Sequence, residues 1–241
     1  MASNQKTVIV TGASQGIGAG VAQSFLNRGY NVVANSRNIT KTNPFAASAN
    51  VALVDGDIAD PCTAAKIVDA AVSRFGRIDV LVNNAGIFIP KPFTEYTTEE
   101  FNTLVSTTLA GFLYVSQLAV KQMLRQKSGS IVNVSTTLVD QPIAGIGASV
   151  QIMVKGALNA VTRALAIEYA KEGIRVNTVA LGVINTPMHK PETHDFLKSL
   201  HPVGRIGEIK EVVDAILFLT DATFTTGEIF HIDGGAHAGK W

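Results

Sequence analysis

Near its N-terminus the chain reads Thr11-Gly12-Ala13-Ser14-Gln15-Gly16-Ile17-Gly18. This glycine-rich segment lies between a short β-branched run, residues 7–10, and an amphipathic stretch, residues 17–28, that stops at Gly29. A glycine just beyond the last apolar residue is typical of a helix C-terminus. Glycines after a strand let the backbone approach a pyrophosphate, whose charge is met by the N–H groups and the dipole of the following helix. The segment therefore predicts a strand, a phosphate-binding turn and a helix in succession.

Short β-branched runs and longer amphipathic stretches continue to alternate along the chain. Further strands are expected at residues 31–35, 51–54, 78–82, 130–134, 175–179 and 229–232. Further helices are expected after Pro61 and at residues 97–125, 148–171 and 209–220. Thr97 and Glu100 have capping-box spacing at the start of one of them. This alternation predicts an α/β doubly wound Rossmann fold, with a seven-stranded parallel sheet flanked by helices.

The composition limits the organisation of the chain and its partners. Of 241 residues, 46% are apolar and 16% charged, and a net charge of +1 gives no basic field for nucleic acid or an anionic membrane. No apolar run approaches the roughly 20 residues that span a bilayer. No flexible linker divides the chain, so residues 1–241 are expected to form one domain, with a substrate loop at about 184–207. A single cysteine, Cys62, and no signal-peptide pattern favour a cytoplasmic protein that acts on a small molecule.

Further short motifs follow the glycine-rich segment in a fixed order. They are Asp57-Ile58, Asn83-Asn84-Ala85-Gly86, Lys155, Arg175-Val176-Asn177, Asn185-Thr186-Pro187, Pro202-Val203-Gly204-Arg205 and Asp233-Gly234-Gly235. With the Gly-x-x-x-Gly-x-Gly spacing of the first segment, this series resembles the short-chain dehydrogenase/reductase family over essentially the whole chain. The resemblance implies one seven-stranded Rossmann domain, a nicotinamide dinucleotide cofactor and assembly into homotetramers.

The end of the second expected strand bears on the choice of cofactor. It reads Asn35-Ser36-Arg37-Asn38 and lacks the carboxylate that would bind the ribose hydroxyls and exclude a 2′-phosphate. Arg37 can pair with a phosphate and Ser36 can donate to it, which predicts NADP(H), although Arg37 is also compatible with a plain solvated side chain. With these two, the residues assigned to the cofactor through the resemblance are Gly12, Ser14, Gln15, Gly16, Ile17, Gly18, Asp57, Ile58, Asn84, Ala85, Gly86, Lys155, Gly182, Ile184 and Thr186.

The catalytic pattern of the family is incomplete in this chain. The family reduces carbonyls with Ser, Tyr and Lys, the last two as Tyr-x-x-x-Lys, and here Gln151 stands four residues before Lys155. No small register change brings any of the four tyrosines into that position: Tyr30, Tyr96, Tyr114 and Tyr169. A glutamine amide donates hydrogen bonds but cannot give up a proton. The resemblance places Thr136 at the serine position, with Ser135 as the alternative, and Thr108 where the family has an asparagine.

Three interpretations of this incomplete site remain open. The first is an NADPH-dependent reductase acting on a C=N or C=O group, or an activated C=C, of a small apolar or cyclic substrate. The second is a non-redox enzyme, and the third is a nucleotide-binding regulatory protein without catalysis. We favour the first, as an imine or carbonyl reductase, because Lys155, Thr186 and the turn at 182–184 keep the nicotinamide side complete. Asp140, His189 and His194 are further polar side chains expected near the pocket.

Overall fold

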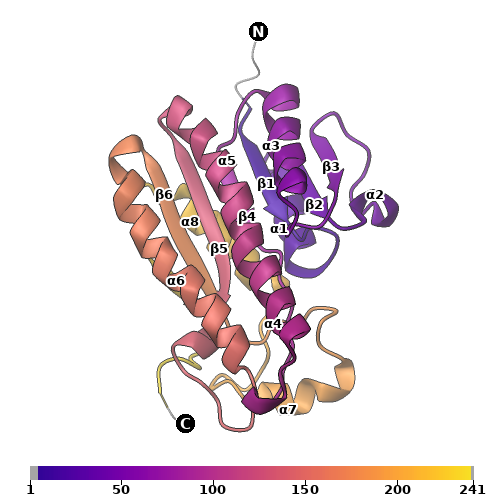
Figure 1. The fold of residues 1–241 in the computed structure, drawn as a ribbon, viewed down its shortest axis with the longest axis vertical. Coiled ribbons are helices and arrows are strands. Elements are labelled where there is room, and N and C mark those ends of the chain that lie inside the picture. The colour runs from indigo at the N-terminus through magenta and orange to yellow at the C-terminus, as the bar shows by residue number, and fades with distance from the viewer. Residues whose placement is uncertain (1–4, 240–241) are drawn as a thin grey trace.

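The computed structural model describes residues 5–239 and contains one parallel sheet (Figure 1). Its seven strands follow the order β3-β2-β1-β4-β5-β6-β7. Their bounds are β1 (Thr7–Thr11), β2 (Asn31–Ser36), β3 (Val51–Asp55), β4 (Val80–Asn83), β5 (Gly129–Thr136), β6 (Ile174–Leu181) and β7 (Ile229–Ile232). The strand order reverses between β1 and β4, and a doubly wound sheet binds its ligand at such a point. The predicted seven-stranded Rossmann fold is confirmed.

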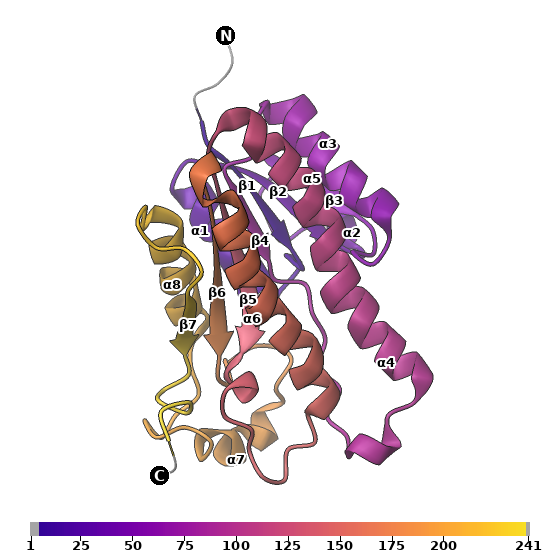
Figure 2. The same cartoon turned by 60° about the vertical axis from the view of Figure 1, so that its left-hand side comes forward.

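Helices cover both faces of the sheet, so its strands are buried on both sides (Figures 1 and 2). One face carries α1 (Gly16–Asn27) and α8 (Ile209–Asp221), and the other carries α3 (Pro61–Phe75), α5 (Gly111–Gln126) and α6 (Ser149–Tyr169). Within β1, Val8 and Val10 pack toward α1 and α8, whereas Ile9 between them packs toward α3 and α5. Successive side chains of a strand point to opposite faces, which explains why apolar residues follow one another along these strands.

The predicted helix at 97–125 contains a wider turn. It begins as α4 (Thr98–Val105), where the Thr97 side chain and Glu100 form the expected capping box, continues through a π-helical turn at Ser106–Ala110, and ends as α5. The π turn carries Thr108 into a buried position. Helices are therefore present where the sequence predicts them, but this irregularity was not predicted.

The expected substrate loop is tied together at its two ends. Ile184 and Gly207 form a parallel bridge, in which the Asn185 N–H donates to Gly207 O at 2.7 Å and the Gly207 N–H donates to Val183 O at 2.9 Å. Between these ends, the sequence analysis expected no helix, yet the structure contains the short α7 (His194–Lys198). We call residues 184–207 the lid loop. A small helix, α2 (Ile39–Thr42), was also not predicted.

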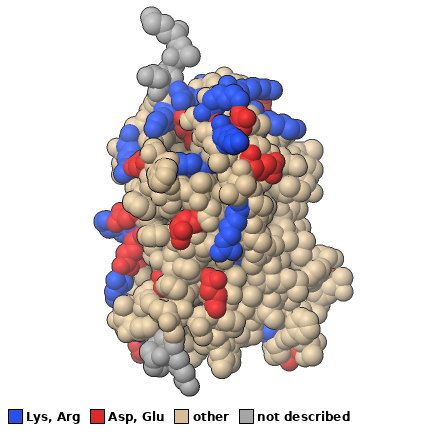
Figure 3. Space-filling view, turned by 90° about the vertical axis from the view of Figure 1, so that its left-hand side faces the viewer, with Lys and Arg blue, Asp and Glu red and all other residues tan. Residues whose placement is uncertain are grey.

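Two long helical runs and the surface charges bear on the expectation that the chain has no membrane or nucleic-acid partner. By length and composition alone, two helical runs, Thr98–Gln126 and Ser149–Glu172, are long and apolar enough to cross a membrane. Both pack on the sheet, and Val115, Ala119 and Ala166 are among their buried residues, so core packing also accounts for their apolar character. On the face in Figure 3, Lys and Arg stand among Asp and Glu, and wide areas carry no charge.

Candidate active site

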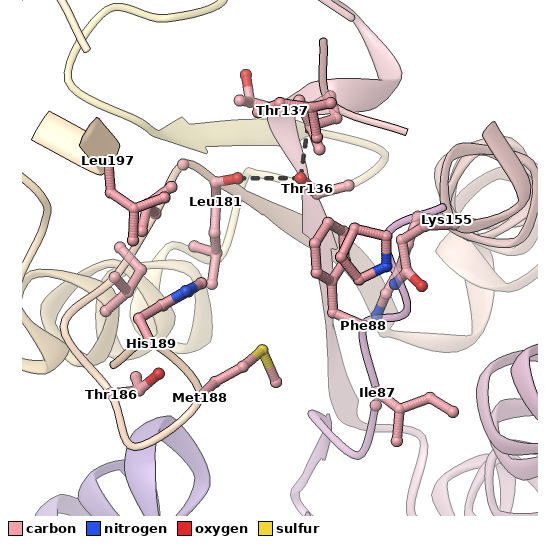
Figure 4. Close-up of a pocket in the computed structure, with 18 of the residues that line it drawn as sticks. Ile87, Phe88, Thr136, Thr137, Lys155, Leu181, Thr186, Met188, His189 and Leu197 are labelled. Atoms are coloured by element: carbon pink, nitrogen blue, oxygen red, sulfur yellow. Dashed lines mark hydrogen bonds between the residues drawn. The ribbon is translucent and has the colours of Figure 1, made fainter. Parts of the chain in front are cut away.

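A cavity of about 1140 Å³ opens at the carboxyl ends of the central strands. Its walls come from the glycine-rich turn after β1, the segment after β4, the end of β5, the first turns of α6 and the lid loop. In Figure 4, Lys155 and Phe88 lie on one side of the cavity, and Met188, His189 and Leu197 of the lid loop lie on the other. The cavity therefore occupies the place where a doubly wound sheet binds its ligand.

The glycine-rich turn requires glycine for two structural reasons. Gly12 has φ +67°, and a Cβ on it would lie 2.9 Å from the Cα of Ala85. A Cβ on Gly18 would overlap the carbonyl oxygen of Gly12. Gly16, with φ +57°, faces Thr186 across the cavity, since a Cβ there would lie 3.7 Å from the Thr186 side chain. A phosphate-binding backbone is thus left open toward the lid loop.

Thr11 and Asn84 hold this turn against the end of β4. The hydroxyl oxygen of Thr11 accepts hydrogen bonds from the N–H groups of Asn84 and Ala85, both at 3.1 Å. The Asn84 side-chain amide donates to the Thr11 carbonyl at 2.9 Å and to the Gly12 carbonyl at 3.1 Å. The side chain of Asn84 is therefore used to shape the turn.

The residues predicted to bind the cofactor divide into two groups. Those that line the cavity are Gly12, Gln15, Gly16, Ile17, Gly18, Asn84, Ala85, Gly86, Lys155, Gly182, Ile184 and Thr186. Those outside its lining are Ser14, Ser36, Arg37, Asp57 and Ile58. Ser36 ends β2, and Asp57 follows β3, so both lie at the same edge of the sheet as the cavity. An extended dinucleotide can reach both groups, since it lies across the carboxyl ends of the strands.

Arg37 is available for an anion at this edge. It is exposed and forms no hydrogen bond or ion pair with any residue between 5 and 239. Asp55 pairs in register with neighbouring Ser36, but its carboxylate accepts hydrogen bonds from the hydroxyl and the N–H of Thr40. These bonds hold the pKa of Asp55 below its usual range. The nearby acid is thus already partnered, and the guanidinium of Arg37 is left for a ligand.

Lys155 brings a buried amine to the cavity. Its Nζ donates a hydrogen bond to the carbonyl oxygen of Val134 at 2.7 Å. A Cβ on Gly86 would lie 3.5 Å from the same nitrogen, which places the ammonium beside the segment after β4. Burial lowers the pKa of Lys155 from 10.5 to about 8, because the charged form loses its hydration.

Gln151 lies one helical turn before Lys155 on α6 and lines the same cavity. It is only 4% exposed, and its Oε1 is buried without a hydrogen-bond partner among the described residues. A buried amide oxygen without a partner is costly, so a ligand that donates to it would be favoured. Gln151 therefore adjoins the cavity with an amide oxygen to which no described residue donates.

The two hydroxyls predicted at the end of β5 both line the cavity and are both engaged. The Thr136 hydroxyl donates to the carbonyl oxygen of Leu181 and accepts from the N–H of Leu138, each at 3.3 Å (Figure 4). Ser135 donates to the carbonyl oxygen of Lys155 at 3.4 Å. Of the predicted catalytic residues, the structure brings Lys155, Gln151, Thr136 and Ser135 together.

Thr108 is separate from this group. It lines a much smaller pocket of about 10 Å³ with Ile58 and Asn83, and not the large cavity. Its hydroxyl and the Oδ1 of Asn83 are both buried without a partner among the described residues. The structure therefore places Thr108, which lies in the π turn, at a separate pocket and does not bring it together with the other predicted catalytic residues.

Other residues of the site were missed in the sequence. The segment from Ile87 to Pro92 follows β4 and lines the cavity, and His201 at the end of the lid loop does so as well. The first followed directly on the Asn83–Gly86 motif, and His201 directly precedes Pro202, so position next to a motif was the available signal. Of the polar residues expected near the pocket, His189 lines it, whereas Asp140 pairs with His231 at 2.9 Å.

Comparison with known proteins places the chain among oxidoreductases. The profile of a family described as enoyl-(acyl carrier protein) reductase, in the short-chain group, matches residues 12–237. The chain is 35% identical to glucose 1-dehydrogenase of Gluconobacter oxydans (strain 621H), over 95% of this chain and 91% of that protein. It is 36% identical to human 3-oxoacyl-[acyl-carrier-protein] reductase, over 95% and 97% of the two chains.

Solved structures give a further comparison. ElxO with NADP bound has a TM-score of 0.91 and 32% identity, covering 98% of this chain and all of that one. A Tyr-to-Phe variant of ElxO, solved with NADPH bound, matches equally well, with a TM-score of 0.91.

Proposed function

The chain belongs to the short-chain dehydrogenase/reductase family of oxidoreductases, and from this premise we propose that it is an NADP(H)-dependent reductase of C=N or C=O groups. Its proposed substrate is small and apolar or cyclic. The observation that carries the proposal is the pair on α6: Lys155 is buried, and Gln151 lies one turn earlier, at the position to which the resemblance assigns a tyrosine. Lys155 can still bind the cofactor, whereas Gln151 cannot donate a proton as a tyrosine would.

The residues present fit a nicotinamide dinucleotide with a 2′-phosphate. The open backbone of Gly12, Gly16 and Gly18 suits the pyrophosphate, and the unpaired guanidinium of Arg37 suits the 2′-phosphate. Lys155 would bind the nicotinamide ribose, and the turn at 182–184 would bind the carboxamide. The NADP bound to ElxO supports this cofactor. When bound, the reduced cofactor supplies a hydride.

Loss of the tyrosine favours C=N over C=O as the reacting group. A protonated imine that accepts a hydride on carbon becomes a neutral amine, so this reaction needs no proton from the protein. A carbonyl becomes an alkoxide and needs one. Gln151 cannot supply a proton, but its free Oε1 can accept a hydrogen bond from the N–H of an iminium. ElxO with one tyrosine replaced by phenylalanine was solved with NADPH bound, which supports a cofactor of this kind for a chain of this fold.

The cavity wall suits an apolar substrate. Phe88, Ile143, Met188 and Leu197 contribute apolar surface, and Lys155 and Gln151 of α6 are among the polar residues that line the cavity. A largely apolar pocket with a few convergent polar groups is typical of a small-molecule site. The wall thus accommodates a ring or short alkyl chain with its reacting group turned toward α6.

A substrate panel tests the proposed reaction. NADPH oxidation is followed with cyclic imines, simple ketones and enones, using the native chain, Gln151→Tyr and Gln151→Leu. We expect turnover of imines by the native chain, a gain in ketone turnover in Gln151→Tyr, and weaker imine binding in Gln151→Leu, which removes the amide at nearly constant size. Ketone turnover at least equal to imine turnover in the native chain would refute the C=N preference. NADPH binding without turnover of any compound would favour a regulatory nucleotide-binding protein.

We also propose a cytoplasmic homotetramer built from single-domain subunits, with no nucleic acid or membrane partner. Exposed aromatic rings support an assembly: Phe218 of α8 and Phe230 of the edge strand β7 have ring centroids 5.8 Å apart. Light scattering coupled to size-exclusion chromatography tests the subunit number. A monomer at micromolar concentration would refute the tetramer and leave the reductase proposal untouched.

A further inference from the structure

We propose that His201 is a positioning residue that locks the lid loop to the turn at 182–184, and so sets the nicotinamide end of the cofactor site. The inference rests on the proposed function, because it assigns that turn to the nicotinamide. His201 lies beyond α7, near the end of the lid loop, and its side chain reaches back to the carboxyl end of β6. It touches neither Lys155 nor Gln151 through any described hydrogen bond, so its effect passes through the backbone.

Two hydrogen bonds fix the imidazole of His201. Its Nε2 accepts from the N–H of Val183 at 3.0 Å, and its Nδ1 lies 3.0 Å from the carbonyl oxygen of Leu197 in α7. Since Nε2 accepts, the ring proton of the neutral form must be on Nδ1, which then donates to Leu197. One ring therefore joins the turn after β6 to the lid helix, and only one tautomer can make both bonds.

Close packing gives an independent reason to assign this role. The ring is 4% exposed and lies against Gly182, where an added Cβ would be 2.6 Å from Nε2 of His201. The same Cβ would be 3.0 Å from the Cα of Asp233. The turn is thus held between the imidazole and the segment after β7, so any larger side chain at position 182 would displace one of them.

Backbone hydrogen bonds near His201 also hold the end of the lid loop in place. The carbonyl oxygen of His201 accepts from the N–H of Gly204 at 2.9 Å, and the Val203 N–H donates to Gly234 at 3.3 Å. On the other side of the turn, the carbonyl oxygen of Val183 accepts from Gly207. Val183 is therefore bonded through its N–H to His201 and through its C=O to the end of the lid loop, which fixes the plane of the turn.

Protonation would break this arrangement. A second ring proton on Nε2 would face the N–H of Val183, so the bond would be replaced by repulsion between two donors. Burial holds the pKa of His201 below its usual range, while Asp233 opposes that effect. Asp233 itself is held by Thr137, His237 and the N–H of Gly235. On the lid side, the charged and titratable groups are Lys198 paired with Asp195, His194 and His189. The bond between His201 and Val183 is therefore present at neutral pH, and it is lost as the pH falls through the lowered pKa of His201.

Two substitutions separate the two bonds of the ring. In His201→Gln, the amide oxygen can take the place of Nε2 and accept from Val183. In His201→Asn, the shorter amide can take the place of Nδ1 and donate to Leu197, but it cannot reach Val183. Neither amide titrates. His201→Gln retains the hydrogen bond with Val183 in the turn, and His201→Asn retains the hydrogen bond with Leu197 in α7. Each variant therefore serves as the matched control for the other.

Calorimetric binding of NADP⁺ and of 2′,5′-ADP to the full chain tests the effect on the site. The second ligand has the adenosine and 2′-phosphate but no nicotinamide. In His201→Asn, we expect the Kd of NADP⁺ to rise about fivefold, as for one lost hydrogen bond. In His201→Gln, it should stay within twofold, and 2′,5′-ADP should bind all three proteins equally. On acidification from pH 7.5, the ratio of the two Kd values should rise more in the native chain than in His201→Gln, which keeps His189 but has no titrating group at position 201.

Amide hydrogen exchange of the peptide containing Val183, measured without any nucleotide, tests the bond itself. Faster exchange in His201→Asn than in His201→Gln is expected, with β1 peptides as the internal reference. Equal exchange and equal NADP⁺ affinity in the two variants would overturn the inference. If the native chain binds neither nucleotide, the cofactor proposal fails, and the exchange measurement still decides whether His201 holds the turn.

Discussion

Replacement of Lys155 by methionine should make the protein more stable at neutral pH while weakening its binding of NADPH. The folded-state pKa of Lys155 is about 8, against 10.5 for an ordinary lysine, and burial is the cause. At about 1.4 kcal/mol per pKa unit, the charged amine raises the free energy of the folded state by about 3 kcal/mol at pH 7. Methionine fills nearly the same space without a charge, although it gives up the hydrogen bond to Val134.

The pH dependence of this effect has a definite sign. The folded pKa is lower than the unfolded pKa, so the unfolded chain binds more protons between about pH 8 and 10.5. The free energy of unfolding of the native chain should therefore rise with pH across this window, by about 2 kcal/mol between pH 7 and 9.5 for this residue. The Lys155→Met variant lacks this contribution, so its stability advantage should shrink by the same amount.

Urea unfolding from pH 7 to 9.5 measures the free energies of unfolding of the native chain and of Lys155→Met. Other titrating groups contribute equally to both proteins, so they cancel in the difference between the two free energies. Lys210→Met is the control, because Lys210 is exposed and pairs with Asp214 on the surface of α8. The difference in free energy of unfolding between Lys210→Met and the native chain should stay nearly constant with pH. A constant difference for Lys155→Met as well would refute the reasoning, since it would mean that the ammonium of Lys155 is hydrated in the folded protein.

Three further substitutions probe other parts of the structure. Arg37→Ala should raise the Kd of NADPH more than tenfold and leave that of NADH within about twofold; equal losses by calorimetry would mean that Arg37 does not bind the phosphate. Gly18→Ala should lower the free energy of unfolding by more than about 2 kcal/mol, because its methyl group would overlap the carbonyl of Gly12, and an unchanged urea midpoint would contradict this. Arg175→Met should lower the free energy of unfolding by about 2–3 kcal/mol, because the Arg175 guanidinium donates three hydrogen bonds to carbonyls at and just beyond the end of α8. A decrease below about 0.5 kcal/mol would show that water takes the place of the guanidinium.

The strands could be predicted because they are buried on both faces and are therefore rich in consecutive apolar, β-branched residues. Strands β5 and β6 extend two residues beyond their expected carboxyl ends, to Thr136 and Leu181. At the other end of a strand, the sequence assigned Ile78 although β4 begins at Val80. The Gln126 side chain donates to the carbonyl oxygen of Ile78 and accepts from its N–H. A contact between residues so far apart in the sequence leaves no local pattern, so this boundary could not be predicted.

The site residues could be predicted where they lie close to one another in the sequence. Gln151 and Lys155 lie four residues apart on one helix, and the cavity brings them together as the period of a helix requires. His201 was missed because its partner, Val183, lies eighteen residues away across the lid loop. Thr108 was assigned to the catalytic group from the resemblance alone, and the structure places it at the small pocket beside Ile58 and Asn83.

The bridge between Ile184 and Gly207 bears on how the protein changes in evolution. The ends of the lid loop are already joined, so doubling the length of chain between them costs only about 0.6 kcal/mol of closure entropy. Insertions and exchanges inside the loop that keep His201 therefore leave the sheet and the nucleotide-binding turn nearly unaffected. Substrate range can diversify in this loop, and a loop from a relative, grafted between these two residues with His201 retained, should yield a folded protein with a new substrate preference.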